Sequence, residues 1–94
     1  MAEFAPLTGD EIRETLTDAD IIYPMAAQTF FASGRTLYET DAPEAWGYWR
    51  VEQGQYCSQW PPSDLWACYD VSRDGDKIRF TAGDGFVTDG VLQD

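Results

Sequence analysis

Two cysteines, Cys57 and Cys68, carry the most reactive side chains of this sequence, with ten residues between them. Such a pair could form a structural disulfide, act as a redox couple, help to bind a metal ion or remain as two buried thiols. A metal site needs further ligands, and this chain has no histidine, the commonest one. Redox pairs usually have C-x-x-C spacing at the start of a helix, and this spacing does not occur. The choice between a disulfide and free thiols then depends on the elements that hold the cysteines.

The charge balance of the chain is strongly acidic, because 17 Asp and Glu residues face 6 Lys and Arg residues and give a net charge of −11. A surface of this kind repels phosphates and argues against nucleic-acid binding. It can attract a basic protein or cations. The lack of histidine also removes the commonest general base and every Ser–His or Cys–His catalytic pair.

Carboxylates are the remaining candidates for acid–base chemistry. Glu52, Asp64 and Asp70 lie nearest to the aromatic segment around the cysteines, but their spacing does not select them from the other acids. The segment Asp74-Gly75-Asp76 superficially resembles a calcium loop, yet it lacks the ligand series of an EF-hand and is typical of a β-turn. We therefore predict no catalytic residue, no metal site and no cofactor.

One short helix precedes a long β region in the predicted order of elements. Thr8 and Glu11 form a capping box, and Ile12 and Leu16 share a face, which together predict a helix at about 9–17. Between about 21 and 92, apolar runs alternate with Gly, Pro and Asp turn signals. We expect a single domain over residues 1–94 with a mainly β, α+β fold. About seven strands would form a curved antiparallel meander, as an open barrel or half-barrel.

Tight turns at 53–54, 62–63 and 74–75 fix the register of the middle strands. The three turns are placed independently, and they agree on one face of the sheet. The row that they align is Val51, Tyr56, Tyr69 and Phe80. We predict that this row is buried.

The same register places Cys57 directly opposite Cys68 on the other face of the sheet. Opposed strand residues suit a structural disulfide, worth about 2–3 kcal/mol by the loop-entropy model. We therefore predict a disulfide, with two unpaired buried thiols as the alternative. A structural disulfide would indicate an oxidising compartment.

Tryptophans and tyrosines divide between the two faces. Trp49 and Trp60 point to the core face, whereas Trp46, Tyr48 and Trp66 point to the face of the cysteines. An outer aromatic group of this kind can anchor a partner or stack on sugars. The other explanation is that Ile12 and Leu16 of the helix dock on it and make a second small core. We expect the helix to dock there, because so short a helix needs an apolar surface.

The motifs WGYWRVEQGQYCSQW and WACYDV, with LTGDEI at the start, resemble a group of short uncharacterised bacterial secreted proteins. In that group an LTGxEI start precedes a YCSxW…WACYxV cysteine hairpin. The resemblance covers about half of the chain and implies a secreted or periplasmic location. It implies no activity and no catalytic residues.

The function that we expect is a non-catalytic secreted or periplasmic β-domain that binds a protein or small ligand. Met1 to Pro6 lack the basic start and apolar core of a signal peptide. Because the predicted disulfide indicates an oxidising compartment, we expect that a signal sequence was removed. One alternative is a carboxylate-dependent hydrolase acting on cell-wall or sugar substrates. The other is an acidic cytosolic decoy or inhibitor protein. No apolar run is long enough to predict a membrane span.

Overall fold

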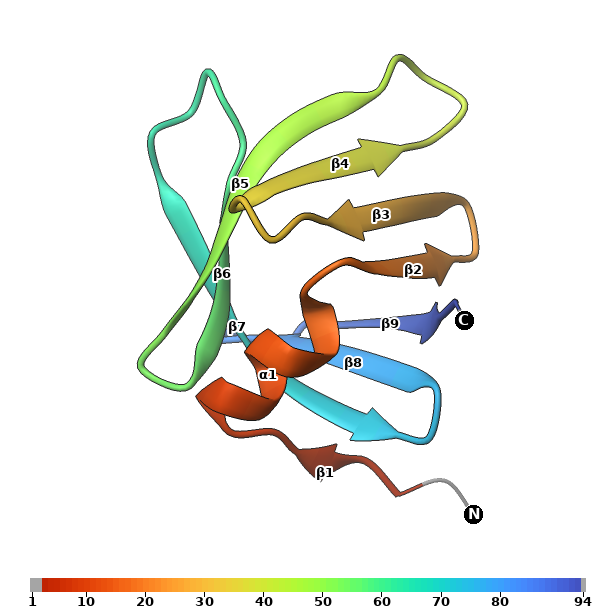
Figure 1. Cartoon of the computed structure of the whole chain (residues 1–94), viewed down its shortest axis with the longest axis vertical. Helices are drawn as coiled ribbons and strands as arrows, with labels where there is room; N and C mark the ends of the chain where they lie inside the picture. Colours follow the sequence, from red (N-terminus) through yellow and green to blue (C-terminus); the bar gives the residue numbers. More distant parts are fainter. Residues whose placement is uncertain (1–2, 94) are drawn as a thin grey trace.

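Eight antiparallel strands close into a barrel in the computed structural model, which describes residues 3–93 (Figure 1). The strands are β2 (Ala19–Tyr23), β3 (Ala26–Phe30), β4 (Arg35–Glu39), β5 (Ala45–Glu52), β6 (Gln55–Gln59), β7 (Trp66–Asp74), β8 (Lys77–Ala82) and β9 (Val87–Leu92). Each strand pairs with the next along the chain, and β9 returns to pair with β2 through Ile21–Leu92 and Ile22–Val91. A short strand β1 (Ala5–Pro6) also pairs with β7. Met1, Ala2 and Asp94, which the predicted domain included, lie outside the described residues.

The predicted architecture was right in its helix and its antiparallel sheet, but the expected open or half-open form was wrong. The barrel is closed, and it has eight strands rather than about seven. Closure depends on Gly90 of β9, where a Cβ would contact Cγ2 of Ile21 and would lie 2.9 Å from Cε1 of Tyr23. Because Gly90 has no side chain, β9 can lie close to these interior residues of β2.

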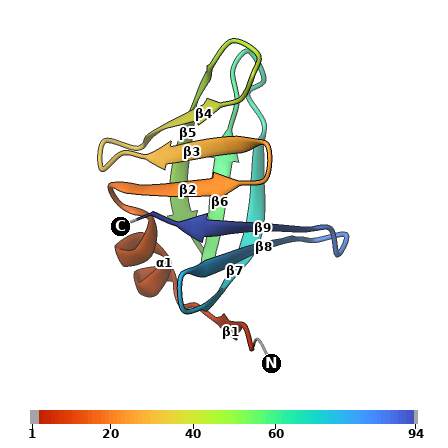
Figure 2. The ribbon, with the colours of Figure 1, turned by 90° about the vertical axis from the view of Figure 1, so that its right-hand side faces the viewer.

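Helix α1 (Gly9–Leu16) forms where the sequence predicts it and closes one end of the barrel. The capping box is present: Glu11 N–H donates to Thr8 Oγ1, and Thr8 N–H donates to Glu11 Oε1 at 2.9 Å. Ile12 and Leu16 are fully buried in the core that fills this end. In Figure 2 the helix lies at one side of the barrel, and the β2–β3 and β8–β9 connections lie at the other.

The register of β5, β6 and β7 is the predicted one, with Val51 opposite Tyr56 and Tyr56 opposite Tyr69. The predicted Tyr69–Phe80 pair is wrong, because Phe80 lies opposite Val71 and Tyr69 lies opposite Ala82. The two-residue turn is at 75–76 instead of 74–75, so that Gly75 takes the first turn position with φ +62°. The pairing register between β7 and β8 therefore differs from the predicted one by two residues. A register shift of two keeps every side chain on its face of the sheet, and Phe80 is still buried.

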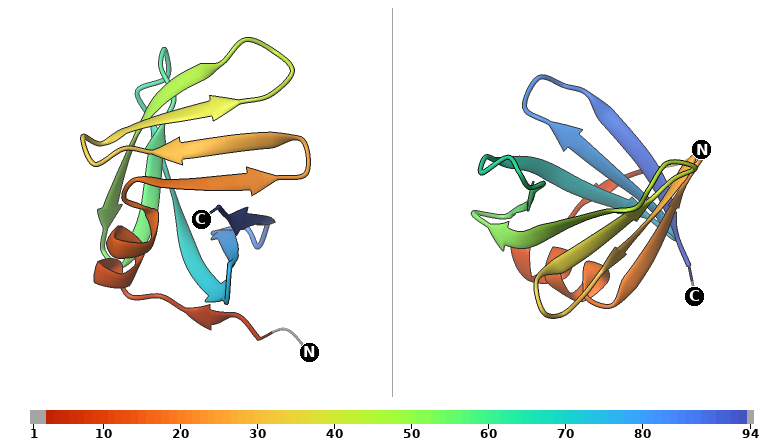
Figure 3. Two further views of the ribbon diagram at one scale, coloured as in Figure 1. Left: turned by 45° about the vertical axis from the view of Figure 1, so that its right-hand side comes forward. Right: turned by 90° about the horizontal axis from the view of Figure 1, so that it is seen from above.

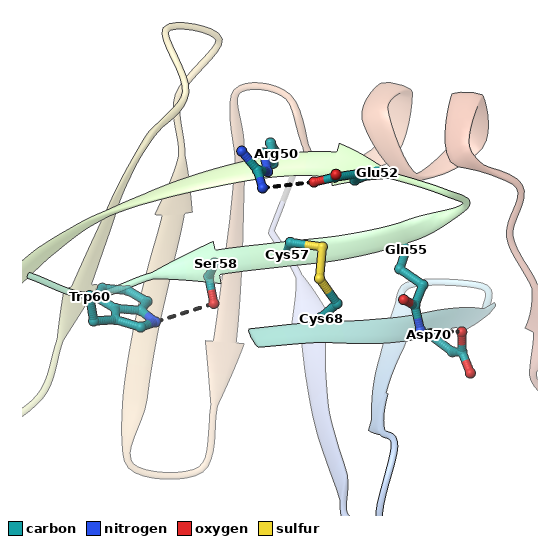
Figure 4. Close-up of a disulfide and its surroundings, with 8 residues drawn as sticks. All are labelled: Arg50, Glu52, Gln55, Cys57, Ser58, Trp60, Cys68 and Asp70. Atoms are coloured by element: carbon teal, nitrogen blue, oxygen red, sulfur yellow. Dashed lines mark hydrogen bonds and ion pairs between the residues drawn. A yellow bond between two sulfur atoms is a disulfide. The ribbon is translucent and has the colours of Figure 1, made fainter. Parts of the chain in front are cut away.

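Cys57 and Cys68 are opposite each other and form the predicted disulfide. The bridge links β6 to β7 on the outside of the barrel, beside the Arg50–Glu52 ion pair of β5 (Figure 4). Of the remaining predicted row, Tyr56 is buried, whereas Val51 and Tyr69 are half-buried. These two residues pack against the core rather than belonging to its fully enclosed part.

Substitution Gly90→Ala should destabilise the protein, because the new methyl group would overlap Ile21 and crowd Tyr23 at the strand pair that closes the barrel. We expect a loss of about 1–3 kcal/mol in the free energy of unfolding, measured by urea denaturation. Gly83→Ala is the matched control, since a Cβ there would meet nothing within 4 Å. Equal stability of the two variants would contradict the close packing of β9 against β2.

Reduction of the Cys57–Cys68 disulfide should lower the free energy of unfolding by about 2–3 kcal/mol, because the 11-residue separation gives a short loop. Intact mass of protein folded without reductant should be two hydrogens below the mass of the reduced form. Recovery of two free thiols under those conditions would refute the bridge.

Candidate functional site

The end of the barrel opposite α1 contains a cavity of about 420 Å³. Its volume lies in the usual range for pockets that hold small organic molecules. Its wall comes from all eight barrel strands and the start of the β6–β7 connection. The lining residues are Tyr23, Gln28, Tyr38, Ala45, Tyr56, Ser58, Trp60, Tyr69, Phe80 and Thr88. We call this cavity the mouth pocket.

Aromatic rings make most of the wall of the mouth pocket. The rings of Tyr56 and Tyr69 stack with centroids 6.0 Å apart, and the ring of Phe80 lies 5.2 Å from that of Tyr56. On the other side, Tyr38 and Trp60 meet edge to face at 6.0 Å. Because each ring packs against another, the wall is held in place before any ligand arrives.

A buried amide forms a polar centre next to these rings. Gln28 Oε1 accepts a hydrogen bond from the Tyr23 hydroxyl at 2.9 Å. Gln28 Nε2 donates to Thr36 Oγ1 at 3.0 Å and to the Tyr56 hydroxyl at 3.2 Å. Thr36 in turn donates to the Thr29 carbonyl. The network satisfies the polar atoms of Gln28 and Thr36 inside the barrel and fixes two of the tyrosine rings.

Trp60 is positioned from two sides. Its indole N–H donates to Ser58 Oγ at 3.2 Å (Figure 4). Its ring lies against the backbone at Gly47, where a Cβ would come within 2.6 Å of Trp60 Cε3. Gly47 therefore provides the space that the indole occupies. Trp60, which was predicted on the core face, lies at the edge of the mouth pocket.

Burial keeps the hydroxyls of Tyr23 and Tyr56 neutral. It raises the pKa of Tyr23 far above the ordinary value of 10.0, with the neighbouring Tyr56 and Tyr38 acting in the same direction. Burial also raises the pKa of Tyr56, although hydrogen bonds with Ser58 and Gln28 act against this change. Tyr23 and Tyr56 thus present uncharged hydroxyls over the whole physiological pH range.

The predicted outer aromatic group is where the sequence placed it. Tyr48 lies opposite Gln59 and Gln59 opposite Trp66, while Trp46 and Tyr48 are 41% and 42% exposed. The expectation that α1 covers this face is wrong, because its apolar side chains point into the barrel end. A closed barrel has an end at which its apolar interior would meet water, and the apolar face of α1 covers that end.

Arginines lie over these outer rings. The guanidinium carbon of Arg35 is 5.0 Å from the centroid of the Trp46 ring and 5.3 Å from that of Tyr48. Arg50 lies 3.9 Å from the centroid of Trp66. Such cation–π contacts account for exposed aromatic residues on this face without a partner. Whether the group also serves as a contact patch stays a prediction.

The three carboxylates nearest the cysteine hairpin do not converge on the pocket. Glu52 pairs with Arg50 at 2.8 Å, Asp70 accepts from Gln55 at 3.1 Å, and Asp64 is exposed in the β6–β7 connection. Asp74-Gly75-Asp76 forms the expected turn between β7 and β8. Within residues 3–93, no three Cys, Asp or Glu side chains come together as metal ligands.

The mouth pocket itself was not predicted from the sequence. Strand alternation identified Tyr56, Tyr69 and Phe80 as inward residues but assigned them to packing. Gln28 was missed, although a polar residue two positions before the inward Phe30 signals a polar site inside the barrel.

Compared with protein-family models, curated proteins and solved structures, the chain gives no match. The resemblance to a group of bacterial secreted proteins stays a prediction. The part of the chain that the structure describes has no helix long and apolar enough to span a membrane.

The free energy of unfolding should fall as the pH rises above about 10. Unfolded Tyr23 and Tyr56 ionise near their ordinary pKa of 10.0, whereas the folded protein keeps both protons, so alkali favours the unfolded chain. Each tyrosine should contribute a slope of about 1.4 kcal/mol per pH unit. Urea denaturation between pH 8 and about pH 11 measures this slope. Tyr23→Phe should reduce it, while Tyr48→Phe, at an exposed position, should leave it unchanged. Equal slopes in all three proteins would contradict the burial of Tyr23.

Proposed function

We propose that this chain is a non-catalytic binding domain that holds a small organic molecule in the mouth pocket. The observation that carries the proposal is the unequal filling of the barrel. One end is filled by Ile12 and Leu16 of α1, and the other keeps a cavity of about 420 Å³ between packed aromatic rings. A cavity with a preformed aromatic wall and a few polar groups is the usual form of a ligand site.

The groups around the mouth pocket favour binding over catalysis. Its lining consists of aromatic rings, hydroxyls, one amide and the methyl groups of Ala45 and Thr88. Acid–base hydrolysis of glycosides would need two carboxylates on either side of the reacting bond. The candidates Glu52 and Asp70 instead have partners on the outside of the barrel. This arrangement argues against the carboxylate hydrolase that the sequence left open.

We further propose that the domain acts in the periplasm or outside the cell. The support is the Cys57–Cys68 disulfide, which is typical of proteins from oxidising compartments. The same bond argues against the alternative of a cytosolic decoy. The predicted resemblance to secreted bacterial proteins agrees with this location.

Filling the mouth pocket should abolish ligand binding. Thr88 lines the pocket opposite Phe80, so Thr88→Phe would put a ring into the cavity. Val87→Phe is the matched control, because the side chain of Val87 points outward and is 43% exposed. We would titrate the protein with benzyl alcohol, 3,3-dimethylbutan-1-ol and choline, and follow the Trp60 indole signal by NMR.

We expect at least one of these probes to shift the Trp60 signal in the wild type and in Val87→Phe, and none to do so in Thr88→Phe. If no probe shifts the signal in the wild type, or if Thr88→Phe responds like the wild type, the mouth pocket is not the binding site.

A further inference from the structure

The rings of the mouth pocket form an aromatic cage. Six of its ten lining residues are aromatic, and they surround the space from several sides: Tyr23, Tyr38, Tyr56, Trp60, Tyr69 and Phe80. The face of an aromatic ring carries partial negative charge and attracts cations. Among the described lining residues there is no Lys or Arg to fill this cage. On the outside of the barrel, by contrast, arginine side chains lie over aromatic rings, as Arg50 lies over Trp66.

The rim of the mouth pocket carries only negative charge. Four chain connections make this rim, at 24–25, 40–44, 60–65 and 83–86. Figure 3 (left) shows the connections 24–25 and 40–44 on the side away from α1. They contain four acidic residues and no Lys or Arg. The acids are Asp41, Glu44, Asp64 and Asp84, and all four are exposed. The connections 24–25, 40–44 and 60–65 each adjoin or contain a residue that lines the pocket, and 83–86 is separated from the lining residue Thr88 by Val87.

The backbone positions of the basic residues lie towards the opposite end of the barrel, while the side chains of Arg35 and Arg50 extend over the outer rings of Trp46 and Trp66. Of the 6 in the chain, Arg13 is in α1. The other five are in strand segments next to the connections 31–34, 53–54 and 75–76, at the end that α1 closes. They are Arg35, Arg50, Arg73, Lys77 and Arg79. Outside the rim the chain has 13 of its 17 acids and 6 basic residues, so it is acidic there too; the rim differs because its four connections contain acids and no basic residue.

From the cage and the rim together we infer that the ligand of this pocket is a small organic cation with a methylated ammonium group. This inference rests on the proposed binding function and specifies the class of ligand. The aromatic faces would surround the methylated head, and the acidic rim would attract it from solution.

The hydrogen bonds of the pocket favour a methylated ammonium over a metal ion or a primary amine. A hard metal ion needs several free oxygen ligands, and a primary ammonium needs acceptors for three N–H groups. Here Gln28 Oε1 already accepts from Tyr23, and Ser58 Oγ already accepts from Trp60. A quaternary ammonium donates no hydrogen bond and needs only the ring faces.

The test compares choline with 3,3-dimethylbutan-1-ol, its uncharged isostere, in NMR titrations of the wild-type protein. We expect choline to bind at least about tenfold more tightly at low ionic strength, since its shape is matched and its charge is the difference. The preference should shrink as salt is added, because the rim charges are exposed.

Equal binding of choline and the alcohol, or binding of benzyl alcohol without binding of choline, would overturn the cation inference and leave the binding function intact. Failure of all three probes would overturn both.

Two sets of variants test separately how the rim charges and the cage rings contribute to choline binding. Neutralising the rim (Asp41→Asn, Glu44→Gln, Asp64→Asn, Asp84→Asn) should weaken choline binding about three- to tenfold at low salt. The control neutralises four exposed acids away from the rim, Glu3, Asp10, Glu14 and Asp76, and should change binding less than about twofold. Equal effects of both sets would show that only net charge matters and would overturn the role of the rim.

For the cage, Tyr38→Leu removes a ring face and Tyr38→Phe keeps it. We expect choline binding to fall at least about fivefold in the leucine variant and to be nearly unchanged in the phenylalanine variant. The alcohol should lose less binding than choline does in the leucine variant, because only choline depends on the charge of the ring face. Loss of choline and alcohol binding in parallel would assign Tyr38 a packing role and overturn its place in the cage.

Discussion

Pairing of β9 with β2 is the constraint on which the other features of this molecule depend. It turns a meander with two free edges into a cylinder in which both sides of each barrel strand are paired. The pairing includes Ile21–Leu92 and continues with a hydrogen bond from Gln93 N–H to the Asp20 carbonyl at 2.9 Å. Once the strands are closed, inward side chains have a fixed volume to fill, and the small residue Gly90 sets how tightly β9 can approach β2.

The two ends of that volume are filled differently. At one end, α1 supplies Ile12 and Leu16, and these pack with Phe30, whose ring meets Trp49 edge to face at 5.7 Å. At the other end no helix is present in residues 3–93, and the Gln28 hydrogen bonds hold rings around a space instead of filling it. The capping box of α1 has a structural role in this division, because it fixes the short helix that closes the first end.

The charged residues also differ between the two ends of the barrel. On the outside of the barrel, Arg35 lies over the Trp46 ring, and Arg79 pairs with Asp89 at 2.8 Å. The acids of the rim have no basic residue beside them in the four connections. A cavity with aromatic walls whose rim holds acids and no basic residue is therefore the part of the surface with the clearest chemical preference.

Local features of the sequence were sufficient for the helix, the disulfide and the pairing of β5, β6 and β7. Thr8 and Glu11 form a local signal, and the turn at Gly54 leaves little freedom of register. The β7–β8 turn was misplaced by one residue and the pairing register by two, because either position puts Gly75 in the turn and keeps Phe80 inward. Closure could not be predicted, since it depends on residues as distant in sequence as Ile21 and Leu92.

The mouth pocket could not be predicted for a related reason. Alternation shows that Tyr56 and Tyr69 point inward, but whether inward residues meet or leave a cavity depends on the diameter of the barrel and the position of α1. The outer aromatic residues looked like the better candidates because Trp46 and Tyr48 are on a face that is usually polar. Arg35 and Arg50, which lie over these outer rings, come from neighbouring positions that strand alternation alone does not pair with them.

The central claim is that the hollow end of the barrel, not the outer aromatic face, is the binding site. Intermolecular NOEs between tetramethylammonium and the protein test it most directly, because they report which rings approach the methyl groups. The account predicts NOEs to the rings of Tyr38, Trp60 and Tyr69. NOEs to Trp46, Tyr48 and Trp66 instead, or none at a saturating concentration, would contradict it.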